Sequence, residues 1–141
     1  MVDKDEIFTI LELYNINGVK TSRWEVDVTN IRDWLVSLDQ TSFTDVIAAL
    51  EVLRDEGPQL GRPLVDTVKG STFKNMKELR PGSRGSTELR VLFAFDPRRI
   101  AVMLVAGDKR GSWAAWYRNH VPKADRIFDD HLTRLAQEKQ T

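Results

Sequence analysis

Lysine, arginine and aromatic side chains gather in the second half of the chain, and these residues have the clearest capacity for chemistry. Between residues 69 and 90 the basic side chains are Lys69, Lys74, Lys77, Arg80, Arg84 and Arg90. A second group follows and contains Lys109, Arg110, Trp116, Tyr117 and Arg118. Cations neutralise phosphates, and aromatic faces stack on unpaired bases for about 1–3 kcal/mol per base. The combination favours a nucleic-acid partner.

Such residues are sufficient for one kind of RNA cleavage, in which a 2′-hydroxyl attacks its own phosphate. That reaction needs a proton acceptor, a proton donor and positive charge at the phosphate. Clustered lysines and arginines supply the charge, and a lysine whose pKa is lowered by like-charged neighbours could move a proton. The chemistry requires no metal ion and no protein nucleophile, and no cofactor is expected.

The charge distribution agrees with an anionic partner at one face. Residues 60–123 hold thirteen Lys and Arg against five Asp and Glu, whereas residues 1–59 hold five against twelve. A formal net charge of zero therefore hides an acidic half and a basic half. The basic segment also contains the two most strand-like runs, 90–96 and 99–106, so we expect its cations to lie on a rigid sheet.

Several other classes of function are disfavoured. There is no cysteine, and the two histidines, His120 and His131, are too few and too far apart for a zinc site. No GxxxxGK[ST], GxGxxG or GxSxG sequence occurs, and residues 81–87 (PGSRGST) are interpreted as a flexible connection. No apolar run approaches the roughly 18–20 residues of a membrane span, and the acidic start does not resemble a signal peptide. We expect a cytoplasmic protein that does not use a membrane.

The helical elements that must hold these residues are marked by spacing and by helix-ending residues. Thr29 or Asn30 caps a short predicted helix that runs to about residue 38. A longer one is predicted over residues 42–56, with an apolar stripe at three- and four-residue spacing, and Gly57-Pro58 ends it. Pro122 is predicted to open a last helix, since proline suits a first turn. His131 falls on its inner face and is interpreted as a core histidine with a bonded partner.

The strands are predicted from β-branched and aromatic runs. Residues 75–80 form one, and 89–96 and 99–106 form a hairpin that turns at Asp96-Pro97-Arg98. Apolar residues on both faces of that hairpin predict central strands covered by helices on one side. Asn17-Gly18 suits a further hairpin between residues 7–14 and 19–29, although 7–14 could instead be a short helix. The order predicts a small α+β sandwich.

Four stretches together resemble the HigB-type toxins of the RelE/ParE superfamily, and more narrowly its phage-associated branch. They are residues 74–80 (KNMKELR), 90–97 (RVLFAFDP), 107–117 (GDKRGSWAAWY) and 122–125 (PKAD). The resemblance covers about residues 24–135. It divides the chain into an N-terminal extension, 1–23, and a RelE/HigB-like domain, 24–141. The extension would be a hairpin, a covered edge strand or a contact surface for an antitoxin.

The resemblance implies a fold and a function. The fold is the RelE microdomain, in which two N-terminal helices pack on a curved antiparallel sheet and a C-terminal helix follows. The function is that of the toxin in a type II toxin–antitoxin system. Such toxins enter the ribosomal A site and cut messenger RNA during translation, and a HigA-like helix-turn-helix antitoxin neutralises them.

The resemblance also implies roles for individual residues. Arg90 matches the catalytic arginine, Lys109 or Arg110 the second catalytic cation, and Trp116 or Tyr117 the aromatic that stacks on the substrate base. Lys77 and Arg80 match the basic strand that grips the phosphate backbone and complete the catalytic set. The remaining RNA-binding candidates are Lys69, Lys74, Arg84 and Arg118. No histidine or glutamate stands out beside these groups as the general base.

Plainer interpretations of the same residues remain. Arg90 could be a solvated strand end, and Lys109 and Arg110 could be cations of a surface turn. Trp113 and Trp116, three residues apart, are more often core residues than base platforms. His120 is placed in a loop. Two other functions fit the composition: a ParE-like toxin that binds DNA gyrase without cutting RNA, or a non-catalytic RNA-binding phage protein.

Overall fold

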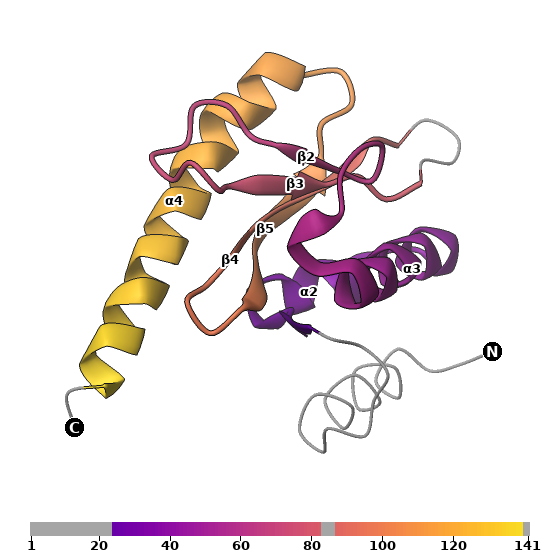
Figure 1. Ribbon diagram of the computed structural model, residues 1–141. Helices are drawn as coiled ribbons and strands as arrows, with labels where there is room; N and C mark the ends of the chain where they lie inside the picture. The colour runs from indigo at the N-terminus through magenta and orange to yellow at the C-terminus, as the bar shows by residue number, and fades with distance from the viewer. Residues whose placement is uncertain (1–23, 83–86, 140–141) are drawn as a thin grey trace.

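The computed structural model describes residues 24–82 and 87–139, which fold as one open sheet between helical layers (Figure 1). The five strands lie in the order β1-β5-β4-β3-β2. They are β1 (Glu25–Asp27), β2 (Val65–Thr67), β3 (Lys77–Leu79), β4 (Leu89–Phe95) and β5 (Ile100–Asp108). The helices are α2 (Arg32–Ser37), α3 (Gln40–Glu56) and α4 (Trp113–Glu138), with short 3-10 turns η1 (Thr29–Ile31) and η2 (Gly57–Gln59). The predicted α+β class, with two N-terminal helices and a C-terminal helix, is confirmed.

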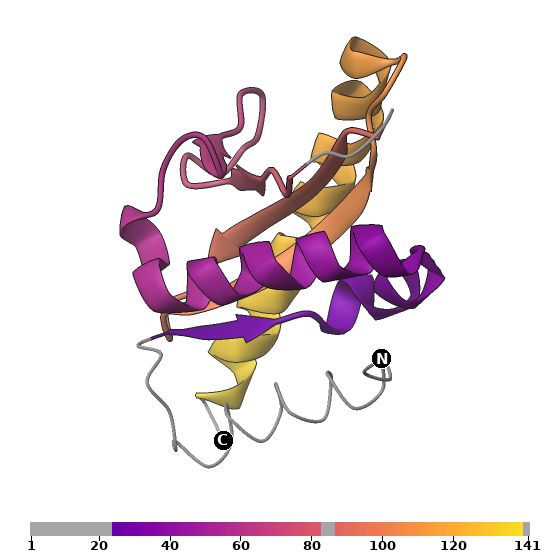
Figure 2. The same cartoon turned by 90° about the vertical axis from the view of Figure 1, so that its right-hand side faces the viewer.

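Strands β4 and β5 form the centre of the sheet, as their apolar runs predict. Val91 and Phe93 belong to the core shared with α3, while Leu92 and Ala94 belong to the core shared with α4. The prediction of helical cover on one side was incomplete, because α3 lies on one face of the sheet and α4 on the other (Figure 2). Pairing is antiparallel except at β1, which runs parallel to β5.

Helix α3 follows the spacing of its apolar residues. Asp39 caps its N-terminus, where a side-chain oxygen accepts a hydrogen bond from the Ser42 amide at 3.2 Å. The helix ends at Gly57, whose φ of 68° is a left-handed conformation that glycine adopts readily. The predicted stripe is buried, and its members are Phe43, Val46, Ile47, Leu50 and Leu53. The helix begins two residues earlier than predicted.

The predicted start of the last helix was wrong. Helix α4 begins at Trp113, and Pro122 lies inside it. An interior proline costs about 3 kcal/mol because it lacks an amide hydrogen and crowds the preceding turn. Apolar residues on both sides of Pro122 share one buried face, and this packing overrides the local preference; they are Trp116, Val121, Ala124 and Phe128. His120 therefore lies in a helix, not in a loop.

Two polar contacts hold α4 on the sheet. His131 Nε2 lies 2.9 Å from the buried carboxylate of Asp96 at the β4–β5 turn, which confirms the core-histidine interpretation. Asp125 accepts hydrogen bonds from the Ser71 hydroxyl at 2.5 Å and the Thr72 amide at 2.9 Å, both in the β2–β3 loop. The helix is thus tied to the turn beyond β4 and to the loop before β3.

Some predictions lie outside the described residues. The hairpin at Asn17-Gly18 and the roles suggested for residues 1–23 belong to this group, as does Arg84. Only residues 24–29 of the predicted strand 19–29 are described, and they contain β1. Across residues 24–82 and 87–139, no helix combines the length and the apolar character that a membrane crossing requires.

A close approach between β5 and α4 gives a test of this packing. A Cβ atom at Gly107 would lie 2.8 Å from Trp116 Nε1, and the Trp116 side chain is buried. We expect Gly107→Ala to lower the free energy of unfolding by about 1–3 kcal/mol in urea titrations. Gly61→Ala is the matched control, because a methyl group added there would meet no atom within 4 Å. Equal effects of the two substitutions would contradict the packing.

Candidate active site

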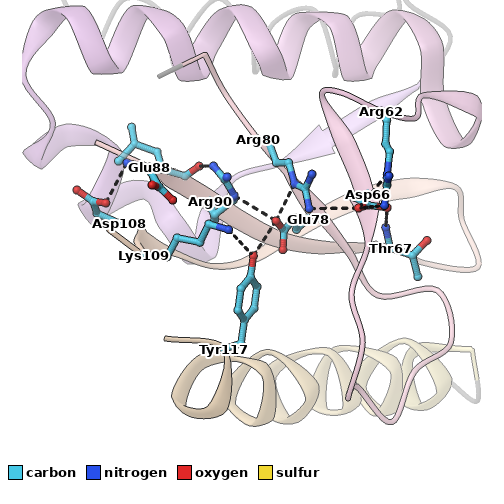
Figure 3. Close-up of polar contacts among 11 residues, drawn as sticks. Arg62, Asp66, Thr67, Glu78, Arg80, Glu88, Arg90, Asp108, Lys109 and Tyr117 are labelled. Atoms are coloured by element: carbon cyan, nitrogen blue, oxygen red, sulfur yellow. Dashed lines mark hydrogen bonds and ion pairs between the residues drawn. The ribbon is translucent and has the colours of Figure 1, made fainter. Parts of the chain in front are cut away.

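The sheet register brings the charged residues of two strands onto the face that carries α4. Glu78 pairs with Leu92 and Leu79 pairs with Val91, so the next position along places Arg80 beside Arg90. Leu79 packs in the core shared with α3, and its neighbours Glu78 and Arg80 therefore point to the opposite face. Tyr117 reaches the same place from α4, and Lys109 from the residue after β5 (Figure 3). We call these five residues, Glu78, Arg80, Arg90, Lys109 and Tyr117, the Glu78 cluster.

One carboxylate oxygen is the centre of the cluster. Glu78 Oε1 accepts hydrogen bonds from Arg80 Nε and from the Tyr117 hydroxyl, each at 2.9 Å. Arg90 Nε lies 3.1 Å from the same oxygen. The Glu78 side chain is only 4% exposed, so its charge depends on these partners rather than on water.

Arg90 is held close to Glu78 without a complete set of hydrogen bonds. Its Nη1 donates to the Leu89 carbonyl at 2.8 Å. Its Nε forms an ion pair with Glu78 by distance, but the N–H direction does not meet hydrogen-bond geometry. Among the described residues this buried Nε therefore has no hydrogen-bond acceptor. A buried donor in that state costs about 1–3 kcal/mol, and one of its known explanations is a ligand that completes the bond.

Lys109 is buried although it follows a surface turn. Its residue exposure is 3%, and its Nζ lies 3.2 Å from the Tyr117 hydroxyl and 3.6 Å from the centre of the Trp113 ring. Asp108 shapes the turn by accepting hydrogen bonds from the amides of Glu88 and Arg110. Burial, together with the nearby Arg90 charge, lowers the pKa of Lys109. A lysine so placed gives up its proton more readily than an exposed one.

Two other members of the cluster, Tyr117 and Arg80, have raised pKa values. Burial raises the pKa of Tyr117 to about 12, and its hydrogen bond to the charged Glu78 acts in the same direction. Burial disfavours the charged form of Arg80, but its hydrogen bond to Glu78 and the negative charges of Glu78 and Asp66 together raise the pKa of the guanidinium. Arg80 also donates to Asp66 at 3.1 Å, and a hydrogen bond from Arg62 lowers the pKa of Asp66. Arg80 thus lies between two carboxylates (Figure 3).

The structure brings together some of the predicted site residues and not others. Arg80, Arg90, Lys109 and Tyr117 meet in the Glu78 cluster. Lys77 points toward the α3 side, where its Nζ lies 3.4 Å from the Pro58 carbonyl. Four more cations are exposed outside the cluster: Lys69 and Lys74 on the β2–β3 loop, Arg110 on the turn after β5, and Arg118 on α4.

The two tryptophans of α4, the stacking candidate Trp116 and its neighbour Trp113, are placed differently. Trp116 is 6% exposed, and its ring stacks on His120 in the core beneath α4. Its faces are not open to a base in this arrangement, which agrees with the plainer interpretation of that residue. Trp113 was given the same interpretation and does not follow it, because it is 56% exposed.

Sequence reasoning missed Glu78 and Trp113. A signal for Glu78 was present, because residues 77–80 alternate and a strand places Glu78 and Arg80 on one face. A lone carboxylate between cations is a candidate proton acceptor. The sequence motifs had indicated no residue for the role of general base. Trp113 could be recognised only once α4 was known to begin there. No group of three His, Asp or Glu side chains in the described ranges is arranged to hold a metal ion.

Comparison with known proteins defines the family. The model of the family described as phage derived protein Gp49-like matches residues 33–129. This is more than half of the chain and includes α3, β2 to β5 and most of α4. The chain therefore belongs to the Gp49-like family of phage-derived proteins.

Within that family the chain is a homologue of HigB-type toxins, as its motifs indicated. It is 54% identical over 116 residues to a Mycobacterium tuberculosis protein named "Putative toxin HigB2", which covers 82% of this chain and 58% of HigB2. It is 49% identical over 102 residues to "Putative toxin HigB3" of the same organism, which covers 72% of this chain and 87% of HigB3. The chain thus spans less than two thirds of HigB2. No solved structure matches it.

The raised pKa of Tyr117 gives a test of the cluster by itself. Because the folded-state value is about 12 and the ordinary value is 10.0, the folded protein holds the phenol proton more tightly than the unfolded chain. The stabilisation of the folded state by this tightly held proton is complete below pH 10 and is lost as the pH rises from 10 to 12. We expect the tyrosinate absorbance that disappears in Tyr117→Phe to develop near pH 12. If this Tyr117 component of the absorbance instead developed near pH 10 in the folded protein, the buried contact with Glu78 would be contradicted.

Proposed function

We propose that this protein is the toxin of a toxin–antitoxin system and acts as a ribosome-dependent messenger-RNA endonuclease. The family membership and the two HigB relatives support the toxin class. The cleavage chemistry is supported by one observation: a buried carboxylate lies against two guanidinium groups and a phenol, with a lysine of lowered pKa beside them. These groups are the proton acceptor, the positive charge and the proton donor that attack by a 2′-hydroxyl needs.

Each member of the cluster has a part in the proposed reaction. Glu78 accepts the proton of the 2′-hydroxyl as its oxygen forms a bond to phosphorus. Arg80 and Arg90 contact the non-bridging phosphate oxygens and stabilise the added negative charge. Lys109 donates a proton to the 5′-oxygen as its bond to phosphorus breaks. The products are a 2′,3′-cyclic phosphate and a 5′-hydroxyl, and no metal ion takes part.

Tyr117 has a positioning role in this proposal. Its hydroxyl donates to Glu78 and lies within hydrogen-bond distance of Lys109, so it links the acceptor to the donor. With a pKa of about 12 it remains a neutral phenol at physiological pH. It therefore holds both groups in place without adding a negative charge beside the phosphate.

The partners follow from the same proposal. The substrate would be messenger RNA on the ribosome, and the neutralising partner would be a HigA-like helix-turn-helix antitoxin. The exposed cations Lys69, Lys74, Arg110 and Arg118 supply phosphate contacts around the cluster. An antitoxin would act either by covering this basic surface or by blocking entry to the ribosome.

Substitutions in the cluster test the chemistry. We expect Glu78→Gln, Arg90→Ala and Lys109→Ala each to slow cleavage by roughly 10²–10⁴-fold, which is typical for the loss of a proton-transfer or charge-stabilising group. Lys77→Ala is the matched control, since its side chain points to the other face of the sheet. The measurements are growth arrest on induction and the mapping of new transcript 5′ ends.

The possible outcomes separate the candidate functions. New breaks within codons that appear with the wild type and with Lys77→Ala, but not with the cluster variants, support the nuclease. Growth arrest without new 5′ ends would overturn the nuclease and favour a gyrase-binding toxin. RNA binding with a steep salt dependence and intact transcripts would favour a non-catalytic binding protein. Equal toxicity of folded wild type and Arg90→Ala would remove Arg90 from the site.

Trp113 provides a test of how the RNA is held. One face of its ring covers the Lys109 ammonium at 3.6 Å, and the side chain is 56% exposed. A base stacked on the open face would place its phosphate near the cluster. We expect Trp113→Ala to weaken binding of single-stranded RNA by about 1–3 kcal/mol, and Trp113→Phe to retain most of the affinity. Trp24→Phe is the control, because Trp24 packs on Phe95 and Arg99 at the other end of β4. Unchanged binding by Trp113→Ala would exclude the stacking role.

A further inference from the structure

The centre of the Glu78 cluster has the form of an occupied anion site. Three polar groups converge on a single oxygen: Arg80 Nε and the Tyr117 hydroxyl donate hydrogen bonds to it at 2.9 Å, and Arg90 Nε lies 3.1 Å away as an ion pair. A phosphate oxygen is an acceptor of the same kind, and guanidinium groups suit it equally well. In the free protein the oxygen at this position is Glu78 Oε1, which belongs to the protein itself.

We propose that the Glu78 carboxylate holds the place of a substrate phosphate oxygen in the free protein, so that the phosphate site is self-occupied at rest. The inference rests on the proposed function and adds a form of regulation to it. A phosphodiester must displace Glu78 from Arg80 and Arg90 before it can bind. The free toxin is therefore partly inhibited by its own proton acceptor.

The charges of the cluster favour such an exchange. Arg80, Arg90 and Lys109 are three cations around the one buried carboxylate of the cluster, while Asp66, which pairs with Arg80, and Glu88, which acts on Lys109, offset part of that charge from outside it. A carboxylate carries one charge and cannot neutralise three cations by itself. A phosphodiester brings a further negative charge into a largely buried site, where opposite charges interact more strongly than in water. The cluster thus attracts a second anion even though the first remains nearby.

Arg90 gives independent support for incomplete occupation. Its Nε is buried and lies close to Glu78, yet within the described part of the chain it has no acceptor with hydrogen-bond geometry. The single oxygen of Glu78 already accepts bonds from Arg80 and Tyr117. A phosphate presents several oxygens, so it can satisfy both guanidinium groups at the same time.

Displacement also prepares Glu78 for its proposed role. In the free protein Glu78 Oε1 already accepts hydrogen bonds from Arg80 and Tyr117, so this oxygen is engaged before a 2′-hydroxyl arrives. Once the arginines turn to the phosphate, Glu78 Oε1 loses its hydrogen bond from Arg80 and can accept one from the 2′-hydroxyl instead. Binding of the substrate and activation of the base are then a single event. Tyr117 remains bonded to Glu78 and limits how far the carboxylate moves.

Inorganic phosphate is the probe, because its binding needs neither RNA nor the ribosome. We expect Glu78→Gln to lower the dissociation constant for phosphate by about tenfold or more in calorimetric titration of the full chain, which corresponds to one charged hydrogen bond released. Glu88→Gln is the matched control. It removes the same charge from a residue that also acts on Lys109, but Glu88 is outside the cluster. The control is expected to change the constant by less than about twofold.

The outcomes are distinct. Glu78→Gln binding phosphate no more tightly than the wild type would overturn the inference, as would an equal gain for Glu88→Gln. If Glu78→Gln fails to fold, Glu78→Asp takes its place, because the shorter side chain withdraws from Arg80 and Arg90; no gain there also overturns it. Loss of RNA cleavage together with tighter phosphate binding supports both proposals. Tighter phosphate binding by a protein that never cuts RNA would end the nuclease proposal and leave the self-occupied site standing.

Discussion

A buried carboxylate surrounded by cations is the constraint around which this molecule is organised. The Glu78 carboxyl group is almost without solvent, a state that is costly unless partners replace water. Its partners come from three different elements, Arg80 beside β3, Arg90 on β4 and Tyr117 on α4. The cluster therefore fixes the register of the strands and the position of the helix. Because Glu78 needs these partners, the guanidinium groups of Arg80 and Arg90 stay together at a position where they could also bind a phosphate.

The helices have unequal parts in this arrangement. Helix α4 supplies Tyr117 and the exposed Trp113, and Asp125 and His131 hold it against the sheet. Helix α3 covers the opposite face and contributes an apolar stripe, but no member of the Glu78 cluster. The acidic helix α3 is thus on the side away from the basic site.

Much of the fold could be predicted from local patterns. The stripe of α3 repeats over several turns, and the β4–β5 hairpin combines β-branched runs with a clear turn, so both were identified. Strands β1 and β2 have three residues each, which is too short to show periodicity. The start of α4 was hidden by Pro122, because a local rule for proline was overridden by packing of the helix on the sheet.

The site was predicted less completely than the fold, for a similar reason. Residue types selected Arg80, Arg90, Lys109 and Tyr117 as candidates, because cations and aromatics suit RNA wherever they occur, and the structure brings these four together. Burial and direction could not be inferred from type, so Lys77 was grouped with residues on the other face, and Trp116 with the exposed aromatics. Glu78 becomes a candidate site residue only through contacts with residues up to 39 positions away in sequence. Such pairings depend on the register of strands, which one sequence does not reveal.

The order of elements has a consequence for how the protein assembles. The five members of the Glu78 cluster lie on or next to the consecutive antiparallel strands β3, β4 and β5 and on the helix that follows them. Closing loops this short costs little chain entropy, and contacts that are local in sequence form quickly. The parallel pairing of β1 with β5 must instead bring residues 25 and 100 together across two helices and three strands. The parallel pairing of β1 is therefore the most non-local contact of the sheet, whereas the Glu78 cluster is built from contacts closer in sequence.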